Sequence, residues 1–187
     1  MNIWKRSLLG LLCFGLLTGL GFKKDSPDTQ RKEIEATTSE VLADLYRQVP
    51  GSKDFLKKAA GYAVFSSIGM NVFVVSTANG DGLARYKNGK KVYMRMLSAG
   101  AGVGMGIKDF RLIFVFQNKG AMDKFVTEGW TAGAQADAAA THDNQGDAAA
   151  LAIDVSPGVK LFQLTESGLA LQATIQGTKY WADEDLN

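Results

Sequence analysis

The chain has 187 residues, of which 46% are hydrophobic and 21% are charged, and these values indicate one globular domain rather than two domains or a disordered chain. The formal net charge is only +2, which argues against a general nucleic-acid-binding protein because such domains are strongly basic. The single cysteine and the single histidine, His142, give no basis for a disulfide, a metal site or a histidine-dependent catalytic triad.

Residues 1–21 have the features of an export signal. Lys5 and Arg6 precede an apolar run that is short for a membrane span, which needs roughly 20 residues. Small residues near Gly21 suit cleavage there, and residues 22–187 would then form a single domain. An uncleaved membrane anchor is the alternative. We expect an exported protein in the periplasm or attached to the cell envelope.

Two helices are predicted at the start of this domain. A short one over residues 53–60 is expected to be capped by Ser52. A longer one over residues 28–49 has apolar side chains at steps of three and four residues, which is typical of a helix that buries one stripe. Its exposed face carries a mixture of charges, so we expect it to pack against the domain rather than against a membrane. The predicted stripe consists of Ile34, Thr38, Val41, Leu42, Leu45, Tyr46 and Val49.

Strands dominate the prediction from residue 62 onward. Asn79-Gly80 and Asn88-Gly89 are predicted turns, and the second favours a two-residue hairpin loop that places Lys87 directly opposite Lys90. The predicted strands include residues 62–65, 72–77, 83–87, 90–96, 111–116 and 159–165.

One further helix is predicted near residues 118–128. Asn118 is its expected cap, and Met122, Phe125 and Val126 are expected to face inward. It follows residues 111–116, whose continuous apolar run suits a strand that is covered on both faces. The sequence therefore predicts an α+β fold with a strongly curved, mainly antiparallel β-sheet or barrel-like core.

Glycine occupies every second position between residues 98 and 107, at Gly100, Gly102, Gly104 and Gly106. A dinucleotide-binding loop would lead into a helix, and a phosphate-binding loop needs other residues beside its lysine, so we expect no nucleotide. In a strand these glycines would leave one face without side chains. We expect a sharply bent core strand, with a groove floor that admits a ligand as the alternative.

Four segments in this order resemble the SYLF domain family of lipid-binding proteins: "AAGYAVFSSIG", "GDGLARYKNGK", "SAGAGVGMGIKDFRLIFVFQNKGAMDKF" and "LTESGLALQATIQG". The resemblance runs from about residue 52 to residue 180. It implies a glycine-rich α+β domain that binds phosphoinositide or other anionic lipid head groups. This chain departs from the family after "FSSIG", where the family usually continues Lys-Gly-Gly-Phe-Gly and this chain has Met70-Asn71-Val72-Phe73-Val74.

Basic residues gather in two places that could bind anions. One is the predicted hairpin, which contains no acidic residue between positions 85 and 95, and the other is the short helix. Near an anionic membrane, each such charge could contribute about 1 kcal/mol to the binding free energy. The alternative is that these charges are solvated and only prevent other strands from pairing with the sheet edge. The candidate lipid-binding residues are Arg85, Lys87, Lys90, Lys91 and Arg95 in the hairpin and Lys53, Lys57 and Lys58 in the helix.

The sequence thus favours a non-enzymatic domain that binds anionic lipid at the bacterial cell envelope. We expect no enzymatic activity, because no set of acid, base and nucleophile can be assembled from the residues. We also expect no cofactor, metal, nucleotide or nucleic acid. A structural or protein-interaction module of the envelope, with a protein partner, is the alternative. An enzyme that acts on lipid is a third, weaker hypothesis.

Overall fold

The computed structural model describes residues 25–72, 75–101, 110–132, 137–139, 148–165, 168–170, 172–174 and 177–187. The predicted signal, His142 and the glycines at positions 102, 104 and 106 lie outside them. The helices are α1 (Pro27–Gln48), α2 (Ser52–Lys58) and α3 (Lys119–Thr127). The strands are β1 (Gly61–Val72), β2 (Val75–Tyr86), β3 (Lys91–Ala101), β4 (Phe110–Phe116), β5 (Trp130–Thr131), β6 (Asp137–Ala139), β7 (Ile153–Ser156), β8 (Val159–Thr165), β9 (Gly168–Ala170), β10 (Gln172–Thr174) and β11 (Thr178–Ala182).

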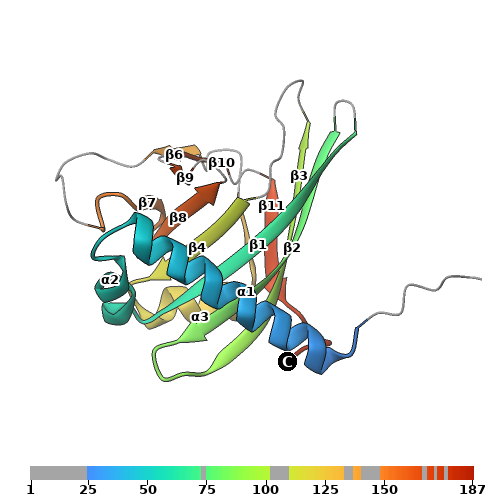
Figure 1. Cartoon of the computed structure of the whole chain (residues 1–187), viewed down its shortest axis with the longest axis horizontal. Helices are drawn as coiled ribbons and strands as arrows, with labels where there is room; N and C mark the ends of the chain where they lie inside the picture. Colours follow the sequence, from blue (N-terminus) through green and yellow to red (C-terminus); the bar gives the residue numbers. More distant parts are fainter. Residues whose placement is uncertain are drawn as a thin grey trace, which may run out of the picture.

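Nine of these strands form one antiparallel sheet that curls into a half-barrel (Figure 1). Their order is β5-β11-β3-β2-β1-β4-β8-β7, with β9 beside β8, while β6 and β10 pair separately. The long hairpins β1–β2 and β2–β3 form its centre. The predicted α+β class with a strongly curved antiparallel sheet is confirmed.

Contacts between aromatic rings show how strongly the sheet curves. Strands β4 and β11 are four steps apart in the sheet, which corresponds to about 19 Å at the usual spacing between strands. The rings of Phe114 in β4 and Tyr180 in β11 nevertheless lie with their centroids 5.1 Å apart. These side chains therefore meet across the concave face, which encloses the larger hydrophobic core.

Helix α3 lies on this concave face. The Asn118 side chain accepts a hydrogen bond from the backbone amide of Ala121 at 2.8 Å, which is the predicted helix cap. The Phe125 ring contacts Phe114, with 5.3 Å between centroids. Met122 and Val126 are buried as well, so the predicted inward face of the helix is confirmed.

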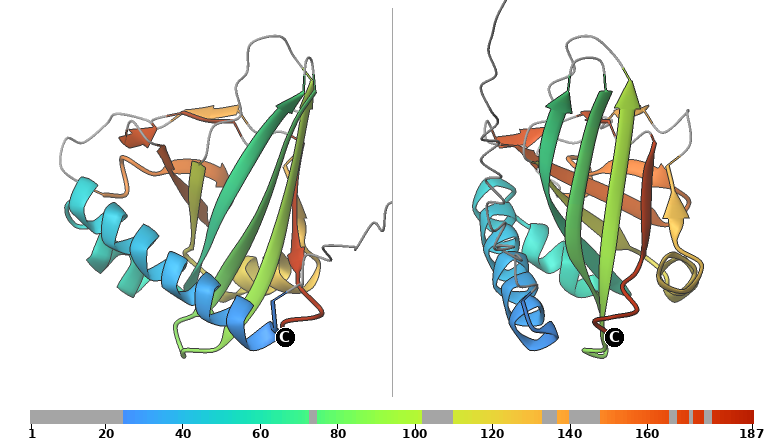
Figure 2. Two further views of the ribbon diagram at one scale, coloured as in Figure 1. Left: turned by 45° about the vertical axis from the view of Figure 1, so that its right-hand side comes forward. Right: turned by 90° about the vertical axis from the view of Figure 1, so that its right-hand side faces the viewer.

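Helix α1 packs on the opposite, convex face and runs diagonally across the strands (Figure 2). Residues Leu45 and Val49 are completely buried near its C-terminal end, where they belong to a second hydrophobic core with Ile113 and Phe162. All of the predicted stripe is buried except Tyr46, which is partly exposed. No helix in the described part of the chain is long and apolar enough to cross a bilayer.

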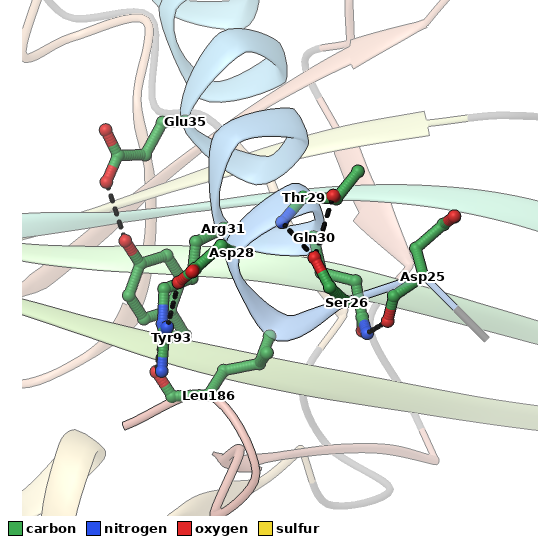
Figure 3. Close-up of polar contacts among 9 residues, drawn as sticks. All are labelled: Asp25, Ser26, Asp28, Thr29, Gln30, Arg31, Glu35, Tyr93 and Leu186. Carbon is green, nitrogen blue, oxygen red and sulfur yellow. Dashed lines mark hydrogen bonds and ion pairs between the residues drawn. The ribbon is translucent and has the colours of Figure 1, made fainter.

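The first turns of α1 are held by polar contacts (Figure 3) and by Ile34, which packs with Leu83 and Leu186. Arg31 donates a hydrogen bond through Nε to the carbonyl oxygen of Leu186 at 2.9 Å. The Tyr93 hydroxyl donates to Glu35 Oε1 at 2.6 Å, which joins the helix to β3. The Ser26 side chain caps the helix by accepting from the Thr29 amide at 3.2 Å.

The predicted turn at Asn79-Gly80 is wrong, because β2 continues through both residues. The glycines of this segment face the concave side, where neighbouring side chains take the space. A Cβ added to Gly82 would meet the ring of Phe65, and one added to Gly80 would lie 2.9 Å from Met96 Cγ. Close packing, rather than a change of chain direction, explains these glycines. The predicted strand at residues 72–77 is divided between β1 and β2, whose ends pair at Val72 and Val75.

The β2–β3 hairpin forms as predicted, but its register differs by one residue. Arg85 lies opposite Lys91, and the Tyr86 amide donates to the Lys90 carbonyl at 2.9 Å. The loop therefore has three residues and ends in Gly89 at a φ of 89°, a common alternative to the two-residue turn. The expected pairing of Lys87 with Lys90 is wrong for this reason. Strand β3 then continues to Ala101, which confirms the start of the predicted glycine strand.

Candidate functional site

A pocket of about 300 Å³ lies between α2, the end of α1, the start of β1 and the β2–β3 hairpin. Lys53 and Lys57 of α2 line one side of it, and Arg85 and Lys87 of the hairpin line another. The two basic segments are separate in the sequence, but the fold joins four of their side chains around one space. We call this space the basic pocket.

Backbone hydrogen bonds at Ala60 fix the two sides of the basic pocket relative to each other. The Ala60 amide donates to the carbonyl oxygen of Phe116 at 2.8 Å, and the Lys87 amide donates to the Ala60 carbonyl at 2.9 Å. The hairpin is thus bound to the segment that directly follows α2. Because Arg85 pairs with Tyr62 in the neighbouring strand, their side chains share the convex face.

The orientation of α2 follows from its apolar side. Leu56 is buried, and the Phe55 ring packs edge-on against Phe162, with 6.2 Å between centroids. Lys53 and Lys57 are four residues apart and therefore lie on the same side of the helix.

The predicted role of Ser52 as helix cap is wrong. Gly51 holds the cap position with a φ of 83°. The Ser52 hydroxyl instead donates to the Val49 carbonyl at 2.7 Å, where the end of α1 leaves carbonyl groups without helical partners.

Two tyrosines, Tyr46 and Tyr62, also line the basic pocket. Tyr86 borders it too, but its side chain packs against the concave core and hydrogen-bonds Asp123 of α3. The Lys53 ammonium lies 5.9 Å from the centroid of the Tyr46 ring. Burial, with a smaller contribution from Tyr62, raises the pKa of Tyr46, so its hydroxyl stays neutral and can donate a hydrogen bond. Sequence reasoning assigned Tyr46 to the core stripe and did not connect Tyr62 with the site. The sequence did offer one indication of their role. Tyr46 lies near the end of a predicted helix and Tyr62 begins a predicted strand, and both lie close to the basic segments in the sequence.

The basic pocket has four cationic side chains and no carboxylate among the described residues that line it. Asp54 forms an ion pair with Lys57 at 3.3 Å, but both side chains are largely exposed, and such pairs contribute little. The other hollows differ in charge. A larger one of about 460 Å³ under the first half of α1 is lined by Glu33 and Asp81, which disfavours anions there.

The other predicted lipid-binding residues lie outside the basic pocket. Lys91 pairs with Glu35 at 2.7 Å, and Arg95 pairs with Asp183 at 3.0 Å. Lys90 places its ammonium 5.7 Å from the centroid of the Tyr86 ring. Lys58 is exposed on α2 but does not line the space. The structure therefore brings together four of the eight predicted lipid-binding residues. Two of the other four, Lys91 and Arg95, form ion pairs with acidic residues.

The chain is similar to a bacterial protein. It is 36% identical over 157 residues to beta cell expansion factor A of Aeromonas veronii. The alignment covers 83% of this chain, and this chain spans 58% of the length of that relative. No family model matches the chain.

The described residues contain no group of three or more histidine, cysteine, aspartate or glutamate side chains that could hold a metal ion. The basic pocket offers cationic and phenolic hydrogen-bond donors instead. This chemistry suits an anion such as a phosphate group.

Proposed function

We propose that the protein is an exported, non-enzymatic domain that binds anionic lipid head groups in the basic pocket. The observation that carries the proposal is the convergence of Lys53, Lys57, Arg85 and Lys87 on one space without an acidic wall. Four like charges repel one another, and a bound anion relieves that repulsion.

Size and chemistry support a phosphate-containing ligand. A volume of about 300 Å³ equals that of roughly ten water molecules, enough for a phosphate group and part of its hydration shell. The Arg85 guanidinium can bind two phosphate oxygens at once. Tyrosine side chains also suit the boundary between lipid head groups and acyl chains, because the ring is apolar and the hydroxyl group can remain in contact with water.

The resemblance to the SYLF family supports the same class of ligand. The relative from Aeromonas veronii bears a name that specifies no ligand, so it does not help to choose one. The proposed location at the cell envelope rests on the N-terminal sequence. Binding of this kind needs no cofactor.

Co-sedimentation with vesicles tests the proposal. We expect the purified protein to sediment with phosphatidylglycerol-containing vesicles at low salt and to be released as the salt concentration increases. It should not bind vesicles of pure phosphatidylcholine. The variant Lys53→Glu/Arg85→Glu should lose this binding. Lys32→Glu/Lys179→Glu makes the same change of charge at two exposed positions outside the pocket and serves as the matched control.

Equal binding by the pocket variant and the control variant would overturn the proposal. Unchanged circular dichroism and thermal unfolding must accompany the result, so that loss of binding is not loss of fold. Capture of one specific envelope protein by both variants, with no binding to vesicles, would favour the alternative interaction module.

A further inference from the structure

A second pocket, of about 270 Å³, lies on the other face of the sheet between α3, the start of β5 and the β7–β8 turn. Phe116, Phe125 and Trp130 provide three aromatic walls, and Val159 and Pro157 provide aliphatic ones. We call it the α3 pocket. It shares no lining residue with the basic pocket, so its role is independent of the proposed function.

The walls of the α3 pocket are firmly held. Phe116 and Phe125 belong to the concave core and are almost completely buried. Trp130 stacks on Tyr180 with 5.7 Å between centroids but remains partly exposed. The β7–β8 turn is fixed because the Gln117 amide donates to the Gly158 carbonyl at 2.9 Å. A preformed apolar space of this kind is typical of small-molecule sites.

One positive charge lies at the edge of the space. Lys124 of α3 lines the pocket and is exposed, and within the described ranges it forms no ion pair. The hydroxyl-bearing Ser156 lies on the opposite wall. The site therefore combines an apolar interior with one cationic group at its opening.

We propose that the α3 pocket binds a small free amphiphile, an aliphatic or aromatic carboxylate, with the apolar part against Phe125 and Trp130 and the carboxylate toward Lys124. Its volume is nearly twice that of the roughly 150 Å³ cavity that accommodates benzene, so a ring with a short substituent or a medium-length acyl chain fits. A whole phospholipid does not.

Nuclear magnetic resonance of the indole groups tests this assignment with sodium octanoate as the probe. We expect the indole N–H signal of Trp130 to shift with octanoate in a saturable manner while that of Trp181, outside the pocket, stays unchanged. The Ala121→Leu substitution fills the pocket and should weaken binding at least tenfold. Ala36→Leu, the same substitution at an exposed position of α1, should leave it unchanged.

The charge is tested separately. Lys124→Gln should weaken octanoate binding about threefold, as expected for an exposed charge, and should not change the binding of octanol. Absence of a Trp130 shift with octanoate would overturn the proposal, as would equal effects of Lys124→Gln on octanoate and octanol. A Trp130 shift with phosphatidylcholine vesicles but not with free octanoate would also overturn it, in favour of an acyl chain that remains in a bilayer.

Discussion

At the scale of single residues, the partners of each basic side chain decide which of them can receive an anion. Lys87 lines the basic pocket, whereas Lys91 already pairs with Glu35 at 2.7 Å. We predict that Lys87→Glu weakens binding to anionic vesicles by about thirtyfold, because reversal of a charge worth about 1 kcal/mol changes the binding free energy by about 2 kcal/mol. Lys91→Glu should weaken it much less. Vesicle titration compares the two, and a larger effect of Lys91→Glu would place the site elsewhere on the hairpin.

Tyr93 gives a second prediction, on the dependence of stability on pH. Burial and the hydrogen bond to Glu35 raise the pKa of Tyr93 from 10 to about 12. A group whose pKa is higher in the folded state stabilises the fold below its unfolded pKa. The free energy of unfolding should therefore fall between pH 10 and about 12.

The Tyr93→Phe variant isolates this effect from that of other tyrosines. It should show a smaller fall over the same pH range, and it should be less stable at neutral pH by about 1 kcal/mol, the usual value of one hydrogen bond. Urea unfolding at several pH values measures both. Identical pH profiles for the two proteins would show that Tyr93 is not tied to Glu35 in solution.

Gly82 provides a third prediction, on the packing that lets the sheet curve. A methyl group there would meet the Phe65 ring and would lie 2.7 Å from the Val64 carbonyl oxygen, so Gly82→Ala should destabilise the fold by about 1–3 kcal/mol. Gly120→Ala is the matched control. Gly120 lies in α3 with its nearest neighbour at 3.5 Å, and alanine there should be neutral or stabilising. Equal free energies of unfolding for the two variants would contradict this account of the curvature.

At the scale of elements, α1 is anchored unequally along its length. Its C-terminal half is held by buried apolar side chains such as Leu45, and its first turns combine the buried Ile34 with the polar contacts of Arg31 and Glu35. Leu45→Ala should lower the free energy of unfolding by about 2–5 kcal/mol. Leu97→Ala, at a side chain that is 42% exposed, should cost much less, and denaturant unfolding compares the two.

The elements that sequence reasoning predicted well are those whose patterns depend on their own residues. The stripe of α1, the cap and inward face of α3, and the continuous apolar run of β4 are confirmed. The predictions were wrong where residues distant in the sequence determine the local structure. Asn79-Gly80 has the composition of a turn, but Met96 and the Ser66 carbonyl oxygen leave no space for a side chain at Gly80 within the strand. Likewise, Asn88-Gly89 suits both a two-residue and a three-residue loop.

At the scale of the whole molecule, the candidate site was also only partly predictable from the sequence. Both basic segments could be recognised there, but their position side by side in the fold could not. It depends on the hydrogen bonds of Ala60 to Phe116 and Lys87 and on the way in which the Leu56 side of α2 is buried. The loss of Lys91 and Arg95 from the set also depends on acids that lie far away in the sequence, Glu35 and Asp183.

The most direct test of the central claim is a titration of the isotope-labelled protein with soluble dihexanoylphosphatidylglycerol below its micelle concentration, followed by nuclear magnetic resonance. We predict saturable shifts of the backbone signals of Lys53, Ala60, Arg85 and Lys87, which diminish as salt is added. Shifts confined to Lys91 and Arg95, or an equal response to the zwitterionic dihexanoylphosphatidylcholine, would contradict the assignment of the basic pocket as a site for anionic head groups.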